Sequence, residues 1–419
     1  MSTLNARIWI PGAASKIGGH GSHAREAGTL AVSRGLGFLK AAGSQCSGIA
    51  AEGRGLVGSS LQWKIGVGRG GWDTGRRRVV VLGTVENKKR MGISTVVLEE
   101  GQERLWHTLP SGLRLEVLLQ RASEVAEEEE EEEEEEVVHK RKPALVMVHG
   151  SYHAAWCWAV FWMDYFAARG YDCWAVSLLG QGGSDVPPQQ EVAGSIQSHA
   201  RDIADFVHHH CRNDDPPPIL IGHSFGGLIV QFYLSQLSTM HGDDEEPQNP
   251  SEKSYPRIAG AILACSVPPT GNMDVVKRYL RSKPIASIKV TLSLAAKLFA
   301  SSLSLCRETF FSPSMDDAQV IKYQKLMKES SHIPLFNLRE LNATLPIPPP
   351  PPSALCPPVL VVGAENDFVL DWQAAEETAA FYGTTPHCVT GVAHDMMLDI
   401  CWKDAAQVLL QWLEEQQHC

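Results

Sequence analysis

The sequence of 419 residues predicts an α/β fold, a mostly parallel sheet flanked by helices, with a helical lid inserted before the strand that carries an acidic site residue. Three observations predict it. From residue 144 onward, short apolar runs alternate with helical patterns, as in repeated strand-helix-strand units. The runs 219–221 and 359–362 are apolar throughout, which suits strands covered on both faces. Between 264 and 359 the patterning is helical, with no clear strand.

The expected core begins with two short strands, 104–109 and 113–119, joined by a Pro-Ser-Gly turn. Further strands are expected at 144–148, 172–177, 218–222, 258–264, 359–362 and 387–390. Core helices are expected at 158–169, 196–210, 226–238, 372–381 and 402–415. The core is therefore expected to comprise residues 104–271 and 353–419.

The N-terminal region differs from the rest of the chain. Its first 85 residues contain eleven Lys/Arg, three acidic residues and eighteen of the 36 glycines. Basic, acid-poor sequence is typical of organelle transit peptides. We expect residues 1–90 to be a disordered extension that directs the chain to a plastid, with a mitochondrial or cytoplasmic location as alternatives. An extension without a targeting role, or a wrongly predicted first exon, is the competing interpretation.

The formal net charge of −11 comes almost entirely from ten consecutive glutamates, 127–136. Without them the charge is −11 + 10 = −1. Ten like charges repel one another and stay hydrated, so this run is expected to be a solvated insertion in the core. The rest of the chain lacks the basic stripe with interleaved aromatic residues that nucleic-acid binding requires, and no nucleic-acid partner is expected.

The ten cysteines are scattered singly and form no C-x-x-C pair, which favours a reducing compartment over a disulfide framework. No apolar run reaches the length of about 18 to 20 residues that a membrane span requires. The apolar stretch around 292–305 is interrupted by Lys297. We therefore expect a soluble protein.

Residues 272–352 are expected to form the helical lid and a Pro-rich return to the core. Helical patterns cover 274–280, 287–303 and 316–329, and the prolines 348–352 predict a stiff extended segment. An unstructured insertion is the alternative. The lid carries a group of basic residues, through which peripheral membrane contact is conceivable: Lys277, Arg278, Arg281, Lys283, Lys289 and Lys297.

The strongest chemical signal is the G-x-S-x-G sequence at 222–226, which lies directly between an apolar strand and a helical run. At a sharp strand-to-helix turn the backbone of Ser224 is strained, and small neighbours at Gly222 and Gly226 let chain segments pass closely. The turn also places the hydroxyl at the positive end of a helix, where developing negative charge is favoured. Ser224 is the expected nucleophile.

A serine nucleophile requires a base and a third group that orients the base. Asp367 follows the strand 359–362 and His394 follows the last strand, so both fall at carboxyl ends of parallel strands, where α/β sheets place their sites. His394 is the expected base and Asp367 its acidic partner. Glu365 and Asp371 are weaker candidates for the acid, and Asp395 is interpreted as a surface or supporting group. Other histidines that could lie near a site are His149, His153, His223, His332 and His387.

Acyl transfer also requires donors for an oxyanion. The backbone N–H of Phe225 and that of Ser151, in the loop after the strand 144–148, are the expected donors. The candidates for the substrate pocket are His149, Gly150, Trp156, Trp372 and Met396. No metal or organic cofactor is expected, and the consecutive histidines 208–210 are interpreted as a solvated helix end because neighbouring helical side chains diverge.

These residues, in this order, resemble the α/β-hydrolase superfamily over about residues 104–416. The likeness rests on His149-Gly150 after a strand, Gly-Gln-Gly-Gly-Ser-Asp at 180–185, the serine turn, Asp367 and His394. The run Val-His-Gly-Ser-Tyr-His-Ala-Ala-Trp-Cys-Trp at 148–158 is similar to the plant methylesterase and hydroxynitrile lyase branch. That resemblance implies the α/β-hydrolase fold and small or medium esters, or cyanohydrins, held under a helical cap. The basic lid, the glutamate run and the proline run depart from that branch.

The sequence thus predicts a serine esterase, carboxylesterase-like or lipase-like, that cleaves carboxylic esters through an acyl-enzyme intermediate. Its expected substrate is a small-molecule or lipid ester. The alternatives are a hydroxynitrile lyase or a small-ligand receptor that uses the same three side chains and pocket.

Overall fold

The computed structural model describes residues 53–54, 60–61, 98–123, 141–211, 216–237, 255–350 and 356–417. The chain divides into two units, Met1–Glu86 and Asn87–Cys419. In the first, β1 (Gly53–Arg54) pairs with β2 (Ser60–Leu61) as antiparallel strands. Almost all of the expected N-terminal extension, and the whole glutamate run, lie outside the described residues.

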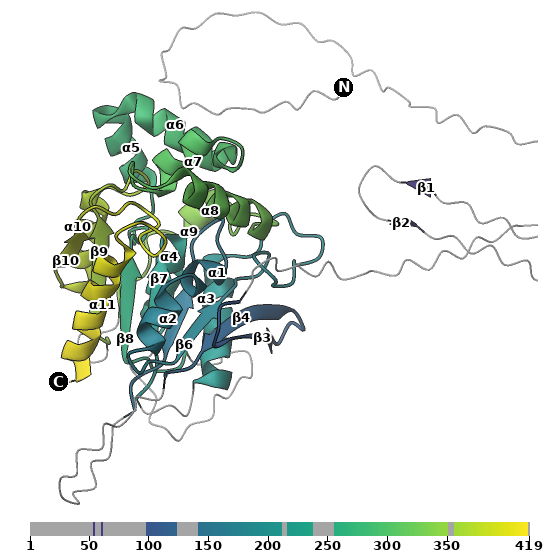
Figure 1. The fold of residues 1–419 in the computed structure, drawn as a ribbon, viewed down its shortest axis with the longest axis vertical. Helices are drawn as coiled ribbons and strands as arrows, with labels where there is room; N and C mark the ends of the chain where they lie inside the picture. Colours follow the sequence, from purple (N-terminus) through teal and green to yellow (C-terminus); the bar gives the residue numbers. More distant parts are fainter. Residues whose placement is uncertain are drawn as a thin grey trace, which may run out of the picture. The chain divides into compact units, whose positions relative to one another are not determined.

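The second unit is built on one eight-stranded sheet with the order β10-β9-β8-β7-β5-β6-β4-β3 (Figure 1). Six strands are parallel to one another, and the pairs β3–β4 and β4–β6 are antiparallel. The strands are β3 (Gln102–Thr108), β4 (Arg114–Gln120), β5 (Leu145–Val148), β6 (Cys173–Val176), β7 (Ile219–His223), β8 (Gly260–Ala264), β9 (Val359–Ala364) and β10 (Pro386–Val389). The predicted fold class is confirmed.

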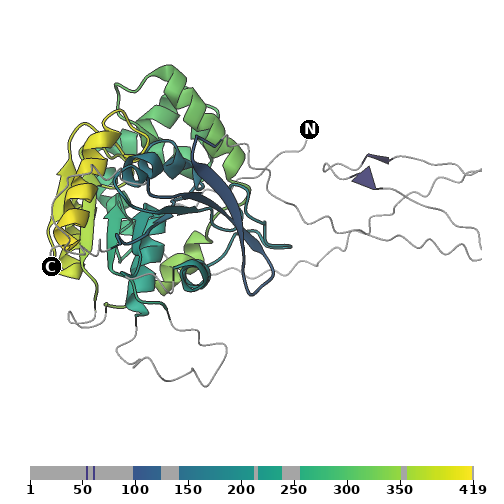
Figure 2. The same cartoon turned by 60° about the horizontal axis from the view of Figure 1, so that its bottom comes forward.

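Helices cover both faces of the sheet, as the turned view in Figure 2 also shows. On one face pack α1 (Trp156–Ala159), α2 (Trp162–Ala167) and α11 (Trp402–Gln417). On the other pack α3 (Ile196–His210), α4 (Phe225–Ser235) and α10 (Trp372–Tyr382). Alternate residues of β7 serve the two cores, with Ile219 and Ile221 in the first and Leu220 in the second. This double burial explains why the strands are apolar throughout.

The segment between β8 and β9 forms a helical insertion, which we define as residues 273–344. It contains α5 (Met273–Ser282), α6 (Pro284–Ala295), the short 3₁₀ helix η1 (Leu298–Ala300), α7 (Leu303–Phe310), α8 (Asp317–Ser330) and α9 (Leu338–Thr344). No helix in the described part of the chain has the length and apolar character to cross a bilayer.

Two predicted helices are wrong in detail. The helix expected at 158–169 is broken at Phe161, whose φ of −142° is not helical, and the break lets both Trp158 and Trp162 enter the core fully buried. The helix expected at 287–303 begins earlier, at Pro284, because proline is favoured in the first helical turn. It ends at Ala295, since Lys297 adopts a left-handed conformation with φ 51° that turns Phe299 into the core.

Candidate active site

Ser224 lies at the sharp turn between β7 and α4. Its φ of 54° and ψ of −120° are unfavourable for a residue with a side chain, so the surrounding structure must hold it there. The two glycines of the motif are required by close approach. A Cβ at Gly226 would lie 2.3 Å from the carbonyl oxygen of Val148, and one at Gly222 would lie 2.6 Å from the Cα of Gly227. The turn therefore projects the hydroxyl from the carboxyl end of the sheet.

Three side chains that are distant in the sequence meet at this edge. His394 Nε2 lies 3.1 Å from Ser224 Oγ, and His394 Nδ1 lies 2.8 Å from an Asp367 carboxylate oxygen. Asp367 follows β9, which pairs with β8, and His394 follows β10, which pairs with β9 at the edge of the sheet. The arrangement allows the imidazole to take a proton from the serine while the carboxylate fixes its tautomer.

The backbone holds the Asp367 carboxylate in place. Its Oδ1 accepts hydrogen bonds from the amides of Val369 at 2.7 Å and Leu370 at 2.9 Å, which leaves Oδ2 for His394. The competing acids have other partners. Glu365 accepts the Gly391 amide, and Asp371 caps α10 and forms an ion pair with Arg278 of α5.

His394 is fully enclosed, and its surroundings bias it toward the protonated form. Burial lowers its pKa, but the charge and hydrogen bond of Asp367, with a further contribution from Asp395, outweigh burial and raise the pKa above the ordinary 6.5. Such a base accepts a proton readily and stabilises the imidazolium that forms when the serine attacks.

A second buried charge lies next to this base. Asp395 is completely buried, and its Oδ2 lies 2.9 Å from His153 Nε2. The other nitrogen of His153 lies 2.9 Å from the carbonyl oxygen of Ser151. Burial opposes the charge on Asp395, but the ion pair and hydrogen bond with His153 lower its pKa below the ordinary value. Of the two interpretations of Asp395, the surface group is wrong and the supporting group is correct, because its side chain is buried beside three histidines.

His223, within the serine motif, belongs to the same cluster. Its Nε2 lies 2.9 Å from the carbonyl oxygen of His394, which must accept the hydrogen bond, so His223 is the donor. Burial, with the repulsion of His394, lowers the pKa of His223 to about 3. A neutral His223 thus fixes the backbone of the loop that carries His394. The sequence marked His153 and His223 only as histidines near a site, since no spacing rule links them to Asp395.

The expected oxyanion donors flank the serine. Phe225 is the first residue of α4, so its N–H has no acceptor within the helix. The loop after β5 lies directly against the nucleophile, because a Cβ at Gly150 would be 2.8 Å from the Cβ of Ser224. Ser151 follows in this loop, and its amide has no acceptor among the described residues. Both amides are available to a substrate oxygen.

The expected pocket residues have differing surroundings. His149 is completely buried, with Nδ1 on the Gly150 carbonyl at 2.8 Å and Nε2 accepting the Leu178 amide at 3.0 Å. Trp156 donates to Ser330 of α8, and Met396 is enclosed in the core.

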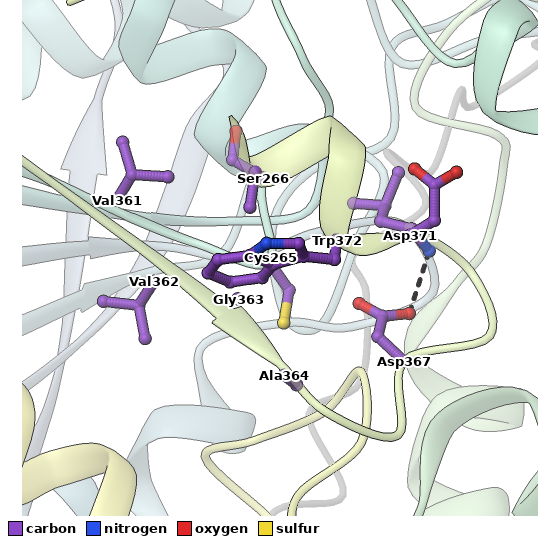
Figure 3. Close-up of a pocket in the computed structure, with 11 residues that line it drawn as sticks. Cys265, Ser266, Val361, Val362, Gly363, Ala364, Asp367, Asp371 and Trp372 are labelled. Atoms are coloured by element: carbon purple, nitrogen blue, oxygen red, sulfur yellow. Dashed lines mark hydrogen bonds between the residues drawn. The ribbon is translucent and has the colours of Figure 1, made fainter. Parts of the chain in front are cut away.

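Trp372 is 38% exposed. Of these residues, only Trp372 lines the small hollow beside Asp367 in Figure 3, and neither Ser224 nor His394 lines it.

Cys265 is a neighbour of the acid that the sequence did not indicate. It follows β8 with a positive φ of 41°, and its Sγ lies within 4.8 Å of polar atoms of Asp367 and His394. Burial, reinforced by the negative charge of Asp367, raises the pKa of the thiol well above its usual value. The thiol beside the carboxylate is therefore neutral. The sequence places Cys265 at the carboxyl end of a parallel strand. That position indicates a possible site residue, but it is not specific, because several residues share it.

Three groups of possible metal ligands occur in the described part of the chain, and two of them contain His394. In the third, His107 Nε2 lies 3.0 Å from Asp205 Oδ2, and His209 Nδ1 donates to the Asp205 carbonyl oxygen at 2.7 Å. These contacts link β3 to α3. The solvated interpretation of 208–210 is correct for His209, which is 48% exposed, and for His210, which is also exposed. His210 in addition stacks on Phe206 and contacts His107.

The helical insertion covers the site. Phe310 of α7 lies 6.4 Å from the His394 ring, measured between ring centres, and Phe336 lies 5.5 Å from the ring of Phe225. Ser224 is only 6% exposed.

Comparison with known proteins identifies a family. The model of the "Alpha/beta hydrolase family" matches residues 145–408. Among curated proteins, "Protein phosphatase methylesterase 1" of Mus musculus is 33% identical over 88 residues, 21% of this chain and 22% of that protein. "Methylesterase 1" of Arabidopsis thaliana is 32% identical over 104 residues, 23% of this chain and 36% of that protein. The expected likeness to plant methylesterases is thus confirmed at low identity, and the match spans well under half of either relative.

Solved structures show the same fold. An esterase from Exiguobacterium antarcticum has a TM-score of 0.51 at 16% identity, over 74% of this chain and all of that one. A bacterial membrane phospholipase A has a TM-score of 0.50 at 18% identity, over 76% of this chain and 88% of that one. At these identities the likeness concerns the fold alone.

Proposed function

Since the chain belongs to the alpha/beta hydrolase family, we propose that it is a serine hydrolase that cleaves carboxylic esters through an acyl-enzyme intermediate. The observation that carries the proposal is the continuous contact from Asp367 through His394 to Ser224, with distances of 2.8 Å and 3.1 Å. These are the distances that proton transfer from a nucleophile to its base requires.

In the proposed reaction, Ser224 Oγ attacks the ester carbonyl and His394 Nε2 takes the hydroxyl proton. The carbonyl oxygen becomes an oxyanion, which the N–H groups of Ser151 and Phe225 stabilise. His394 then returns the proton to the departing alcohol, leaving the acyl group on the serine. Water, deprotonated by His394, attacks this ester and releases the acid, and the proton returns to Ser224.

The geometry supports a role of the helical insertion as a lid. Ser224 is nearly inaccessible in this state, and the phenyl ring of Phe310 lies over the base. Closure of an apolar cover excludes water and strengthens the electrostatic interactions around the oxyanion. We propose that substrate enters when the insertion opens and that the insertion selects the acyl part.

We also propose which kind of ester is cleaved. Two curated relatives are named methylesterases, which favours an ester with a small alcohol. A small-molecule ester and a lipid ester both fit a site of this chemistry. A chain-length series of nitrophenyl esters, compared with matching methyl esters, distinguishes a lid that prefers short acyl groups from one that prefers long ones.

The proposal is tested by labelling with a fluorophosphonate and by turnover of nitrophenyl acetate, for the native chain and for Ser224→Ala. Labelling at Ser224 with rapid multiple turnover supports the esterase. Labelling with scarcely any turnover of any ester contradicts it and favours a lyase or a ligand receptor. Cyanohydrin cleavage and ligand binding then decide between those two.

We further propose that residues 1–90 direct the chain to a plastid, on the strength of their basic, acid-poor composition. A fluorescent protein fused after residue 90 should accumulate in plastids. A mitochondrial or cytoplasmic signal would contradict this.

A further inference from the structure

Helix α6 carries its large apolar side chains on the outside. Ile285 is 75% exposed, Ile288 52% and Leu292 45%, and their spacing of three and four residues places them on one face. A surface helix of a globular protein ordinarily turns such a stripe toward the core. This stripe instead faces outward, toward solvent.

The inward face of the same helix is mixed. Ser287 is 6% exposed and Ser293 is fully buried, and the Ser293 hydroxyl is hydrogen-bonded to Thr309 of α7 at 2.9 Å. Leu294 packs against the core from this face. The helix thus buries two hydroxyl groups while three large aliphatic groups face away from the insertion, and an exposed apolar surface of this kind is typical of an interaction site.

The apolar surface continues onto the neighbouring elements. Exposed large hydrophobic side chains in the described part of the chain are concentrated between 273 and 298, where Met273, Leu280 and Leu298 join those of α6. Figure 1 shows α5 and α6 at the outer end of the insertion, beyond α7 and α8. We call this surface the α5–α6 face.

Positive charge surrounds the α5–α6 face. Residues 273–298 contain six Lys/Arg and one acid, Asp274, for a net charge of 6 − 1 = +5. Asp274 is paired with Lys277, Arg278 reaches Asp371, and Lys289 lies 3.4 Å from Glu308. Arg281 and Lys283 are exposed at the turn between the two helices, next to Leu280 and Ile285.

We propose that the α5–α6 face is a docking surface for a membrane rich in anionic lipid. Helices that lie in a lipid interface combine outward aliphatic side chains with lysine and arginine at their edges, which contact the headgroups. A protein partner would ordinarily be met by a surface depleted in lysine, whereas this face has lysines around its rim. The proposal concerns binding and holds whether or not the proposed esterase activity is correct.

Two contacts connect the docking face to the candidate active site. The Tyr279 hydroxyl of α5 donates to the carbonyl oxygen of Asp367 at 2.8 Å. The Tyr152 hydroxyl, beside Ser151, donates to the carbonyl oxygen of Leu294 on α6 at 2.8 Å. A membrane that holds α5 and α6 is therefore in a position to shift the insertion relative to the site, and lipid-phase substrates would reach it without crossing bulk water.

The test is sedimentation of the full chain with vesicles of phosphatidylcholine alone or mixed with phosphatidylglycerol. We expect binding to the mixed vesicles, weakened by salt, and much weaker binding to phosphatidylcholine. The triple variant Ile285→Ser, Ile288→Ser, Leu292→Ser should lower the partition by about tenfold or more. The pair Arg281→Glu, Lys283→Glu should lower binding to mixed vesicles by about tenfold while leaving binding to phosphatidylcholine unchanged.

Matched controls use exposed positions elsewhere. The pair Leu338→Ser, Ile400→Ser removes aliphatic groups that are 53% and 49% exposed, and Arg339→Glu, Lys403→Glu reverses exposed charges. Both control proteins should bind like the native chain, and circular dichroism should show all variants folded. The proposal is overturned if native protein ignores both kinds of vesicle, or if the controls lose as much binding as the α6 variant. It is also overturned if the native chain is a dimer in solution that the α6 triple variant dissociates, since a second copy would then cover the face.

Discussion

His153 Nε2 and Asp395 Oδ2 lie 2.9 Å apart, both inaccessible to solvent, in direct contact with the loop that carries His394. The other nitrogen of His153 faces the carbonyl oxygen of Ser151, so the ring links the base loop to the loop of the expected oxyanion donor. Both partners of His153 are oxygen atoms of loops that flank the site. The buried pair of His153 and Asp395 thus holds both the loop of His394 and the loop of Ser151 in place.

Asp395→Asn should destabilise the protein. The substitution leaves the buried ring of His153 facing an uncharged amide. Removing one partner of a buried ion pair typically costs about 3–5 kcal/mol. The measurement is the free energy of unfolding in urea at neutral pH, with Asp164→Asn, at an exposed position, as the control. An unchanged free energy would show that the pair contributes nothing to folding.

The same residue should contribute to acid sensitivity. The folded pKa of Asp395 is below the ordinary value of about 3.9. Its stabilising contribution is therefore present above the unfolded pKa and is lost as pH falls through the folded pKa. Native stability should decline below about pH 4 more steeply than that of Asp395→Asn. Parallel pH profiles of the two unfolding free energies would contradict this.

Removal of the proposed catalytic groups should abolish turnover without unfolding the chain. Ser224→Ala should lower kcat by about 10⁶ and Asp367→Asn by about 10⁴, because the asparagine favours the wrong imidazole tautomer. Turnover of nitrophenyl acetate measures the loss of activity, and thermal unfolding shows whether each variant is folded. Retention of more than a tenth of the activity by Ser224→Ala would remove the serine from the mechanism.

The pH dependence of kcat/KM should report His394. Asp367 raises its pKa, and only the neutral ring can accept the serine proton, so the rate should fall on the acid side with a midpoint above 6.5. In the residual activity of Asp367→Asn, the midpoint should move to lower pH, since the opposing carboxylate charge is gone. A midpoint that is the same in both proteins would assign the titration to another group.

Tyr279→Phe should affect the reaction more than folding. The lost hydrogen bond to the Asp367 carbonyl oxygen is worth about 1 kcal/mol, which corresponds to a decrease in kcat of about fivefold if it positions the acid. Tyr165→Phe, which loses a bond of 2.9 Å to Gln407, is the control and should retain full activity. Equal kcat values for the two variants would show that the contact between α5 and the acid loop does not assist catalysis.

Core strands could be predicted because their burial on both faces leaves a continuous apolar run that requires no tertiary information. The prediction placed a strand at 218–222, and β7 spans Ile219–His223. The order of Ser224, Asp367 and His394 at strand ends followed from the same reasoning, since parallel strands bring their carboxyl ends to one edge. In the insertion, the predicted helices 274–280 and 316–329 agree closely with α5 and α8. The helices α7 and α9 were not predicted because they are short, and the end of α6 was missed because Lys297 takes a left-handed conformation that lysine does not signal.

The sequence by itself determined the fold class and the position of the serine turn, because periodicity and a local motif are properties of neighbouring residues. Only the tertiary structure decided that Asp395 is buried against His153, that Cys265 lies beside Asp367, and that α6 turns Ile285 outward and Ser293 inward. A strand that is apolar throughout indicates by itself that both of its faces are buried, whereas the direction that a single charged or apolar side chain faces depends on which distant segments pack around it.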